Sequence, residues 1–406
     1  MTPPARPTMV SFCSHFLSPK RTHIYRQMRG IRDFENWVVT RHRVHADETP
    51  YDRLHVLEKS PFRVFSRLRA YAQRRRLRPL DRFEVEQLLA FLGGKRAVLL
   101  HAYFANEAVR LLPYFERETR AKVVSVHGLD ITEGALPPAD LERLCAAVDL
   151  ILCSSRSLVA SLAGRGCPTA VLRFSPLGVP VPEGEWHRDA PRRSGKRPLR
   201  LLQACRFVEK KGLDLSVRCL AILLGRGVGA TLTLAGDGPE RDSLQTLARE
   251  LGVSESVRFT GFLAFEAVAR EMQQHDVFLH PSRTAASGDL EAIPSAILEA
   301  MAYGLPVIST DHSGIPEAIT HEAEGLLIAE GRAEPLADAV ERLAGDAGRL
   351  YESLSRGAAT RVRSEFSVDA CVTVLQNHYR EAIAMSHARR KPGQHVGLAG
   401  QGSGTE

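Results

Sequence analysis

The 406-residue chain lacks the features that mark secreted, membrane-spanning or zinc-binding proteins. Its seven cysteines are scattered without a Cys-x-x-Cys pair, which argues against a zinc site and favours reduced thiols over a disulfide framework. Residues 1–20 contain no apolar run long enough for a secretory signal. No stretch approaches the roughly 20 apolar residues that span a bilayer, and no repeat of fixed period occurs. These absences predict a cytoplasmic protein.

What the chain does have is enough apolar sequence for two domains and an excess of positive charge. Hydrophobic residues make up 44% of it, so a chain of this length can form two ordinary cores. The formal net charge of +7 indicates an anionic partner, either a nucleotide or a phosphate-bearing surface.

Strand-like and helix-like segments alternate clearly from residue 96 onward. The expected strands lie at 97–101, 122–126, 149–153, 170–174, 199–204, 231–235, 257–262 and 277–280, and two earlier strands are expected at 9–14 and 36–40. This alternation is typical of doubly wound parallel sheets, which bind ligands at the carboxyl ends of their strands. The segment 181–198 is rich in proline, glycine and charge without periodicity, and is predicted to be a linker.

The segment 63–78 is strongly basic, with apolar residues between its arginines. Phe65, Leu68 and Tyr71 fall on one face of a predicted helix. Two interpretations stay open: a solvated helix packed by one stripe, or an amphipathic helix that lies on an anionic membrane surface. Nucleic-acid binding is not expected, because no nucleic-acid motif accompanies the charge.

Two glutamates, Glu291 and Glu299, flank the start of a predicted helix. Pro294 suits the first helical position, and the helix is expected to end at Gly304 before a buried strand at 305–310. The amino terminus of a helix favours anions, and a carboxylate beside it can hold a ribose or sugar hydroxyl by charge-assisted hydrogen bonds. The plain alternative is one loop acid followed by one solvated helix acid.

This stretch resembles the signature of the retaining nucleotide-sugar glycosyltransferases of family four, which have the GT-B fold. In that signature, two glutamates separated by seven residues precede an Ala-Met-Ala-like run, a glycine and Pro-Val. The matching residues are Glu291, Pro294, Glu299, Ala300, Met301, Ala302, Gly304, Pro306 and Val307. Ala292 departs from the pattern, since the family usually has glycine there. The resemblance covers about residues 96–385.

The resemblance implies two Rossmann-like α/β domains that face each other across a cleft. The expected parts are an acceptor-side domain at 1–180, a linker at 181–198, a nucleotide-sugar-binding domain at 199–366, a crossover helix at 367–385 and a disordered tail at 386–406. A glycine-rich loop that family members often carry after the first strand is missing here.

Arg206 and Lys211 stand where the first strand of the second domain meets its helix. A guanidinium and an ammonium five residues apart can converge on a diphosphate, whose departure develops negative charge that must be stabilised. Because no Asp-x-Asp pair occurs in the chain, we expect a metal-independent site without a cofactor. The position of this pair, about 80 residues before the two glutamates, matches the family layout.

Further donor contacts follow from the resemblance. Gly314 is expected to let the backbone approach the diphosphate, and Phe262 and Leu263 occupy the place where the family reads the nucleotide base. Ser295 is a further candidate at the start of the glutamate helix. Asp237 follows the next strand, where a plain strand-to-helix turn is an equal alternative.

Two histidines, His101 and His127, fall at the ends of successive predicted strands. Both segments look like those of subgroups that build bacterial exopolysaccharide, capsule or lipopolysaccharide. That resemblance implies that His127 touches the donor sugar or the acceptor and that Asp130 supports its loop. Tyr103 replaces the second histidine of the first segment, on the expected acceptor side. A purely structural role for either histidine is the alternative.

Together these expectations describe a retaining glycosyltransferase that moves a sugar from a UDP- or GDP-linked donor to the hydroxyl of a saccharide or lipid-linked acceptor. Glu299 would hold the ribose, Glu291 the donor sugar, and His127 would line the reacting face. The protein would be cytoplasmic or peripheral at the inner face of the membrane. The alternatives are a nucleotide-sugar epimerase or a phosphorylase of the same fold, or a non-catalytic nucleotide-binding scaffold at the membrane.

Overall fold

The computed structural model describes residues 6–16, 22–44, 50–59, 61, 80–131, 136–184, 186, 188–190, 197–288, 291–345 and 348–389. The basic segment 63–78 lies outside these ranges, so its predicted membrane contact stays a prediction. Among the described helices, none combines the length and the apolarity needed to cross a bilayer.

The first part of the chain forms a parallel sheet that has seven strands among the described residues, in the order β5-β3-β1-β6-β7-β8-β9. Three of its central strands are buried along their whole length, as expected for strands covered by helices on both faces. The strands are β1 (Thr8–Phe12), β3 (Glu35–Thr40), β5 (Leu54–Val56), β6 (Leu99–Tyr103), β7 (Ala121–Val126), β8 (Leu150–Cys153) and β9 (Leu172–Phe174). A short pair, β2 (His15–Phe16) and β4 (His42–Arg43), lies beyond the ends of β1 and β3.

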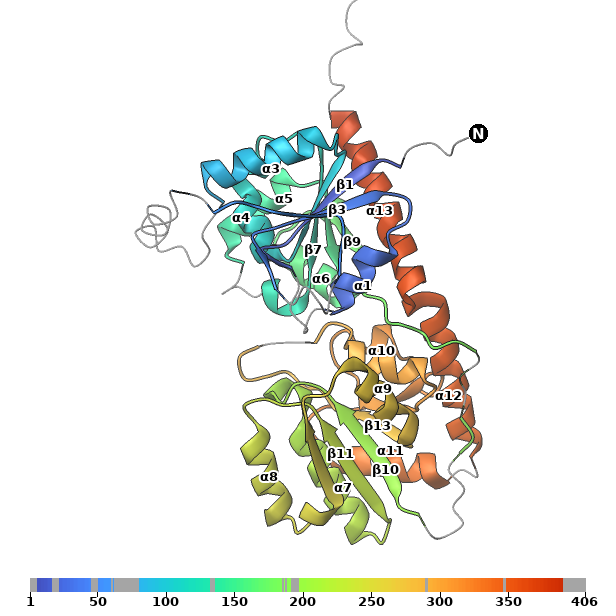
Figure 1. Cartoon of the computed structure of the whole chain (residues 1–406). Helices are drawn as coiled ribbons and strands as arrows, with labels where there is room; N and C mark the ends of the chain where they lie inside the picture. Colours follow the sequence, from blue (N-terminus) through green and yellow to red (C-terminus); the bar gives the residue numbers. More distant parts are fainter. Residues whose placement is uncertain are drawn as a thin grey trace, which may run out of the picture.

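Helices cover this sheet and complete the amino-terminal domain (Figure 1). They are α1 (Thr22–Gly30), α3 (Arg82–Gly94), α4 (Ala105–Phe115), α5 (Pro138–Ala147) and α6 (Arg156–Gly164). Neither α1 nor α3 was predicted from the sequence. In α1, Ile24 and Met28 are buried one turn apart, which is the spacing of an amphipathic helix.

The second part forms a parallel sheet with six strands among the described residues, in the order β12-β11-β10-β13-β14-β15. The strands are β10 (Leu199–Ala204), β11 (Ala230–Ala235), β12 (Val257–Gly261), β13 (Val277–His280), β14 (Val307–Thr310) and β15 (Gly325–Ile328). Its helices are α7 (Leu213–Gly225), α8 (Arg241–Glu250), α9 (Phe265–Gln274), α10 (Ser295–Ala302), α11 (Glu334–Gly345) and α12 (Arg349–Arg361). The two parallel sheets confirm the predicted fold class, and among the described strands of this carboxy-terminal domain β15 is the one that was not predicted.

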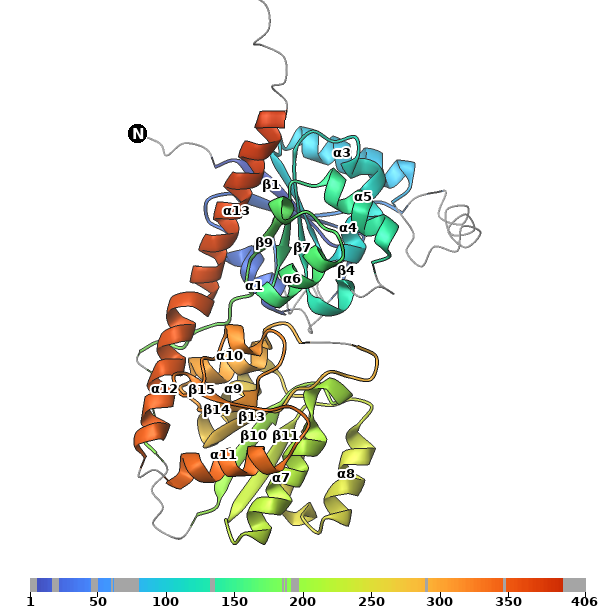
Figure 2. The same cartoon turned by 180° about the vertical axis from the view of Figure 1, so that it is seen from behind.

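The last helix, α13 (Val368–Arg389), returns to the amino-terminal domain and runs beside both domains (Figures 1 and 2). Leu375 and Tyr379 pack with Met9 and Leu99 on one face of the first sheet. Gly178 makes the crossing possible, because a Cβ there would lie 2.6 Å from the Cα of Val368. The helix continues to Arg389, past its expected end at residue 385.

A second link between the domains is the carboxylate of Glu317. It accepts hydrogen bonds from the backbone N–H groups of Arg156 (2.6 Å) and Ser157 (2.8 Å) at the amino terminus of α6. These are groups that a helix cannot satisfy by itself, and their dipoles favour a negative charge. Glu317 therefore caps a helix of the opposite domain.

Candidate active site

Lys211 and Glu291 form a buried ion pair at the carboxyl edge of the second sheet. The Nζ of Lys211 lies 2.6 Å from Oε1 of Glu291 and 3.5 Å from Nε2 of His280. The Nζ of Lys210 lies 4.0 Å from the same carboxylate oxygen. These residues are far apart in the chain but meet because β10 and β13, whose loops carry them, are neighbouring strands.

The charges of this cluster decide its protonation. Burial by itself would raise the pKa of Glu291, but the charges of Lys211 and Lys210 outweigh burial and hold that pKa below its ordinary value. Burial, reinforced by Lys211, lowers the pKa of His280 to about 3. At neutral pH the cluster therefore combines an ionised carboxylate with a neutral imidazole, and can both accept hydrogen bonds from hydroxyls and attract an anion.

Two glycines allow the loops that carry the cluster to pack tightly. Gly212 has a φ of +60° and follows Lys211, and a Cβ at this position would overlap the carbonyl oxygen of Pro281. At Gly314 a Cβ would lie 2.7 Å from the carbonyl carbon of Ala292, next to Glu291. This backbone packing is itself a reason for glycine at 314, and the predicted contact of Gly314 with a diphosphate stays a prediction.

We expect Gly212→Ala to destabilise the protein by more than about 2 kcal/mol, because left-handed backbone costs alanine roughly 1–2 kcal/mol and the new methyl group collides with fixed backbone. Urea unfolding measures this loss. Gly225→Ala is the matched control, because a Cβ at this helix residue meets nothing within 4 Å. The control should be neutral or slightly stabilising, and equal effects of the two changes would contradict the packing argument.

The second predicted glutamate, Glu299, lies on α10 and faces the amino-terminal domain. Its Oε1 is 3.7 Å from an Nη of Arg26 on α1. Burial raises the pKa of Glu299 to about 7, although Arg26 acts in the opposite direction. Pro294 is the N-cap of α10, with an extended ψ of 120°, so the helix begins one residue later than predicted.

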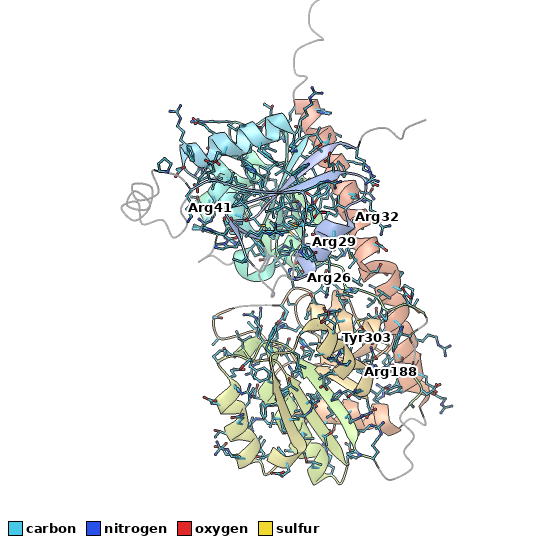
Figure 3. The ribbon with its side chains drawn as sticks, in the orientation of Figure 1. Arg26, Arg29, Arg32, Arg41, Arg188 and Tyr303 are labelled. Atoms are coloured by element: carbon cyan, nitrogen blue, oxygen red, sulfur yellow. The ribbon has the colours of Figure 1, made fainter. Side chains whose placement is uncertain are left out.

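Helix α1 links the two predicted halves of the site. On this helix, the ring of His23 lies edge-on to that of His127, with centroids 6.1 Å apart. The ring of Phe104 contacts His127 in the same manner at 5.2 Å. Arg26, one turn after His23, lies at the junction of the two domains (Figure 3). Its guanidinium reaches Glu299 and stacks on Phe265 of α9. The predicted reacting-face histidine and the predicted ribose-binding carboxylate therefore contact one helix.

Two residues expected on the acceptor side are buried in the first domain. His101 is fully buried, and its ring nitrogens are hydrogen-bonded to the hydroxyls of Tyr379 (2.7 Å) and Ser125 (2.8 Å). Burial lowers the pKa of His101 to about 3. Tyr103 is fully buried as well. This placement favours the structural alternative for His101, and the acceptor-side role of Tyr103 stays a prediction. The side chain of Asp130 lies outside the described part of the structure.

The other candidates follow the ends of neighbouring strands. Arg206 is exposed after β10, and Asp237 is exposed after β11, where it accepts a hydrogen bond from the N–H of Gly238 (2.8 Å). Phe262 follows β12 with 67% of its surface exposed. Leu263 and Ser295 are half-buried. All of these residues belong to the carboxyl edge that carries Lys211, but their contacts with a donor stay predictions.

Several contributors to this region were not predicted from the sequence: His23, Arg26, Phe265 and His280. A signal existed for His280, which is the last residue of a correctly predicted strand beside the glutamate loop. For Arg26, the buried Ile24 and Met28 mark a short helix, but nothing local indicates its partner in the other domain. Within the described ranges, no three His, Cys, Asp or Glu side chains are grouped so that they could hold a metal ion.

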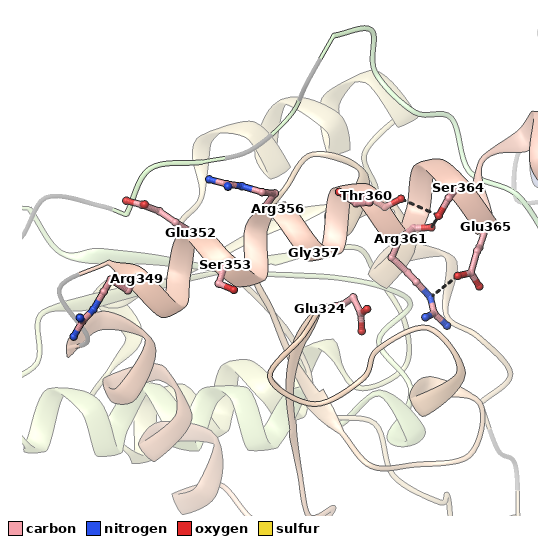
Figure 4. A pocket seen from close by; sticks show the side chains of 10 residues that line it. All are labelled: Glu324, Arg349, Glu352, Ser353, Arg356, Gly357, Thr360, Arg361, Ser364 and Glu365. Atoms are coloured by element: carbon pink, nitrogen blue, oxygen red, sulfur yellow. Dashed lines mark hydrogen bonds and ion pairs between the residues drawn. The ribbon is translucent and has the colours of Figure 1, made fainter.

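A separate pocket of about 720 Å³ runs along α12 and contains none of these candidates (Figure 4). Its lining residues are Glu324, Arg349, Glu352, Ser353, Arg356, Gly357, Thr360, Arg361, Ser364 and Glu365. Two of its charged side chains pair with each other, since Arg361 lies 3.3 Å from Glu365.

Comparison with known proteins shows which family the chain resembles. Residues 186–361 match the model of the family described as glycosyl transferases group 1. The amylovoran biosynthesis glycosyltransferase AmsK of Erwinia amylovora is 35% identical over 273 residues, which is 66% of this chain and 66% of that protein. The match thus spans just under two thirds of this relative's own length.

A second relative is matched over more of its length. The GDP-mannose-dependent alpha-(1-6)-phosphatidylinositol monomannoside mannosyltransferase of Mycobacterium tuberculosis is 33% identical over 269 residues, 64% of this chain and 69% of that protein. In overall fold, the Anabaena protein HepE, solved with UDP and glucose, is similar with a TM-score of 0.72 and 16% identity, covering 92% of this chain and 100% of that one. The chain therefore belongs to the glycosyl transferases group 1 family, family four of the glycosyltransferases, and has the GT-B fold.

Proposed function

We propose that this protein is a retaining, metal-independent glycosyltransferase that moves a hexose from a UDP- or GDP-linked donor to an acceptor hydroxyl in bacterial cell-surface polysaccharide synthesis. The observation that carries the proposal is the buried Lys211–Glu291 pair, at 2.6 Å, on the edge of the sheet where such folds bind nucleotides. Family membership adds the reaction class, and the names of the relatives add the setting.

Each group has one role in this proposal. Lys211 and Arg206 bind the diphosphate, and they stabilise the negative charge that develops as the nucleoside diphosphate leaves. Glu291, kept ionised by the lysines, accepts hydrogen bonds from hydroxyls of the donor sugar. Glu299 accepts hydrogen bonds from the ribose, and His127 lines the face on which the acceptor attacks. Fixed cations of the protein thus do the work for which other enzymes use a divalent ion.

The donor and acceptor classes come from the relatives. By its name the mycobacterial relative uses GDP-mannose, and HepE was solved with UDP and glucose, so both nucleotides are candidate donor carriers. By their names, AmsK is a glycosyltransferase of amylovoran biosynthesis and a Salmonella typhimurium relative is a putative glycosyltransferase of colanic acid biosynthesis. We therefore propose a saccharide or lipid-linked saccharide as acceptor.

The test is to incubate the full chain with UDP- and GDP-hexoses and oligosaccharide acceptors in EDTA, and to follow nucleoside diphosphate release and the anomeric configuration of the product. Acceptor-dependent release with retained configuration supports the proposal. Loss of activity in EDTA would overturn metal independence. Conversion of the sugar without acceptor would indicate an epimerase, a requirement for free phosphate would indicate a phosphorylase, and nucleotide binding without turnover would indicate a scaffold.

A further inference from the structure

The side chain of Arg26, in the amino-terminal domain, packs against Phe265 and Glu299 of the carboxy-terminal domain. Its guanidinium carbon lies 3.9 Å from the ring centroid of Phe265, and an Nη lies 3.7 Å from Oε1 of Glu299. Only about 20% of the Arg26 side chain and 19% of that of Glu299 are exposed. Stacking on a ring and shielding from water restrict both the position and the orientation of the guanidinium group.

Phe265 and Glu299 lie where the nucleoside part of a donor is expected to bind. Phe265 begins α9, three residues after Phe262, in the loop predicted to read the base. Glu299 is the carboxylate proposed to hold the ribose. The 3.7 Å distance to Arg26 exceeds that of a direct hydrogen bond, so the carboxylate keeps acceptor capacity for two hydroxyls.

The ionised form of Glu299 depends on its surroundings. Burial favours the neutral acid, and Arg26 is the group that counteracts burial. The other titratable groups here are Tyr303, the residue that caps the carboxyl end of α10, and Glu266, which lies on α9 and interacts with Arg26. A tyrosine hydroxyl and a second carboxylate cannot supply the positive charge that Arg26 supplies.

We propose that Arg26 is a positioning residue for the donor site, which reaches across from the amino-terminal domain to place a positive charge beside the Glu299 carboxylate and to orient that carboxylate for the ribose. This inference rests on the proposed function. It gives helix α1 a part in nucleotide binding, and it makes the ribose site complete only when the two domains are together. Donor binding and domain closure are thereby coupled through one side chain.

The test is to measure the affinity of the full-length protein for UDP and GDP by calorimetry from pH 6 to pH 9. The variants are Arg26→Ala, Arg26→Lys and, as matched control, Arg29→Ala on the same helix, where the exposed guanidinium bonds the hydroxyl of Tyr25 at 3.3 Å. The ratio of wild-type to variant affinity at each pH cancels the titration of the nucleotide's own phosphate.

Loss of the Arg26 charge should raise the pKa of Glu299. We expect each unit of this rise to weaken nucleotide binding by Arg26→Ala about tenfold at pH 6–7. At pH 9 the carboxylate is ionised in both proteins, so the loss of affinity should be much smaller. Arg26→Lys should restore most of the affinity, and Arg29→Ala should match wild type throughout. A wild-type pH profile in Arg26→Ala, or a loss independent of pH, would overturn the inference.

Glu299→Gln separates this inference from the proposed function. If that variant binds both nucleotides as tightly as wild type, the ribose role of Glu299 fails and the inference fails with it. If Glu299→Gln weakens binding while Arg26→Ala does not, only the role of Arg26 is wrong. If both weaken it, adding Arg26→Ala to Glu299→Gln should change the affinity little. A wild-type protein that binds neither UDP nor GDP would refute both.

Discussion

Lys211→Met is expected to reduce sugar transfer by a factor of about 10² to 10³ or more, the usual effect of removing a group that stabilises charge developing in a transition state. The same change leaves the buried Glu291 without its nearest cation, at a cost to stability of about 3–5 kcal/mol. The side chains of Lys211 and Glu291 are only 13% and 7% exposed, so water cannot replace the lost partner. Initial rates of diphosphate release and urea unfolding measure the two effects.

The double variant Lys211→Met with Glu291→Gln distinguishes the loss of catalytic activity from the loss of folding stability. Because it removes both charges together, it should recover most of the stability that Lys211→Met loses, yet remain inactive. Lys211→Arg should retain stability better than activity. The planar guanidinium group of arginine keeps the positive charge but does not place it where the compact ammonium group of lysine does. Transfer at the wild-type rate in folded Lys211→Met would refute the proposed role.

Glu299→Gln is expected to weaken nucleotide binding about 10- to 100-fold, because hydrogen bonds to a charged group contribute about 1.5–3 kcal/mol. The same variant should change how stability depends on pH. In the folded protein the pKa of Glu299 is raised from 4.5 to about 7. The folded state therefore binds more protons than the unfolded state between these values, so this group's contribution to stability falls as pH rises from about 4.5 to 7.

The variant has no such group. The difference in free energy of unfolding between Glu299→Gln and wild type should thus shift in favour of the variant by up to about 3 kcal/mol between pH 4.5 and pH 8. Urea unfolding at the two pH values measures the shift. Glu250→Gln, at an exposed position on α8, is the control and should show none. A parallel pH dependence of Glu299→Gln and wild type would mean that Glu299 has an ordinary pKa.

Local patterns explain which parts could be predicted. Strands such as β10 and β13 were predicted with their observed bounds, because buried parallel strands are short apolar runs between turn residues. Lys211 and Glu291 could be placed on one sheet edge, because the alternation of strands and helices fixes which end of each strand carries a loop. Their 2.6 Å contact required the strand order, which places β10 beside β13.

Other features depend on partners that no local pattern indicates. His101 was predicted at a strand end in the same way as His127, but β6 continues to Tyr103, so His101 lies within the strand. Its ring is enclosed by Tyr379 of α13, a helix at the far end of the chain. Glu317 caps a helix of the other domain. Helix α1 is only nine residues long, and nothing in its sequence indicates that Arg26 faces Glu299 of the other domain.

The sequence by itself therefore determined the two parallel sheets, the family and the loops that carry the reactive groups, because periodicity and turn residues act over a few positions at a time. Only the tertiary structure decided which histidine is buried, how Glu291 is kept ionised and which arginine faces Glu299. Those outcomes depend on strand order and on the packing of α1 and α13 between distant parts of the chain, where burial and neighbouring charges set the protonation of each group.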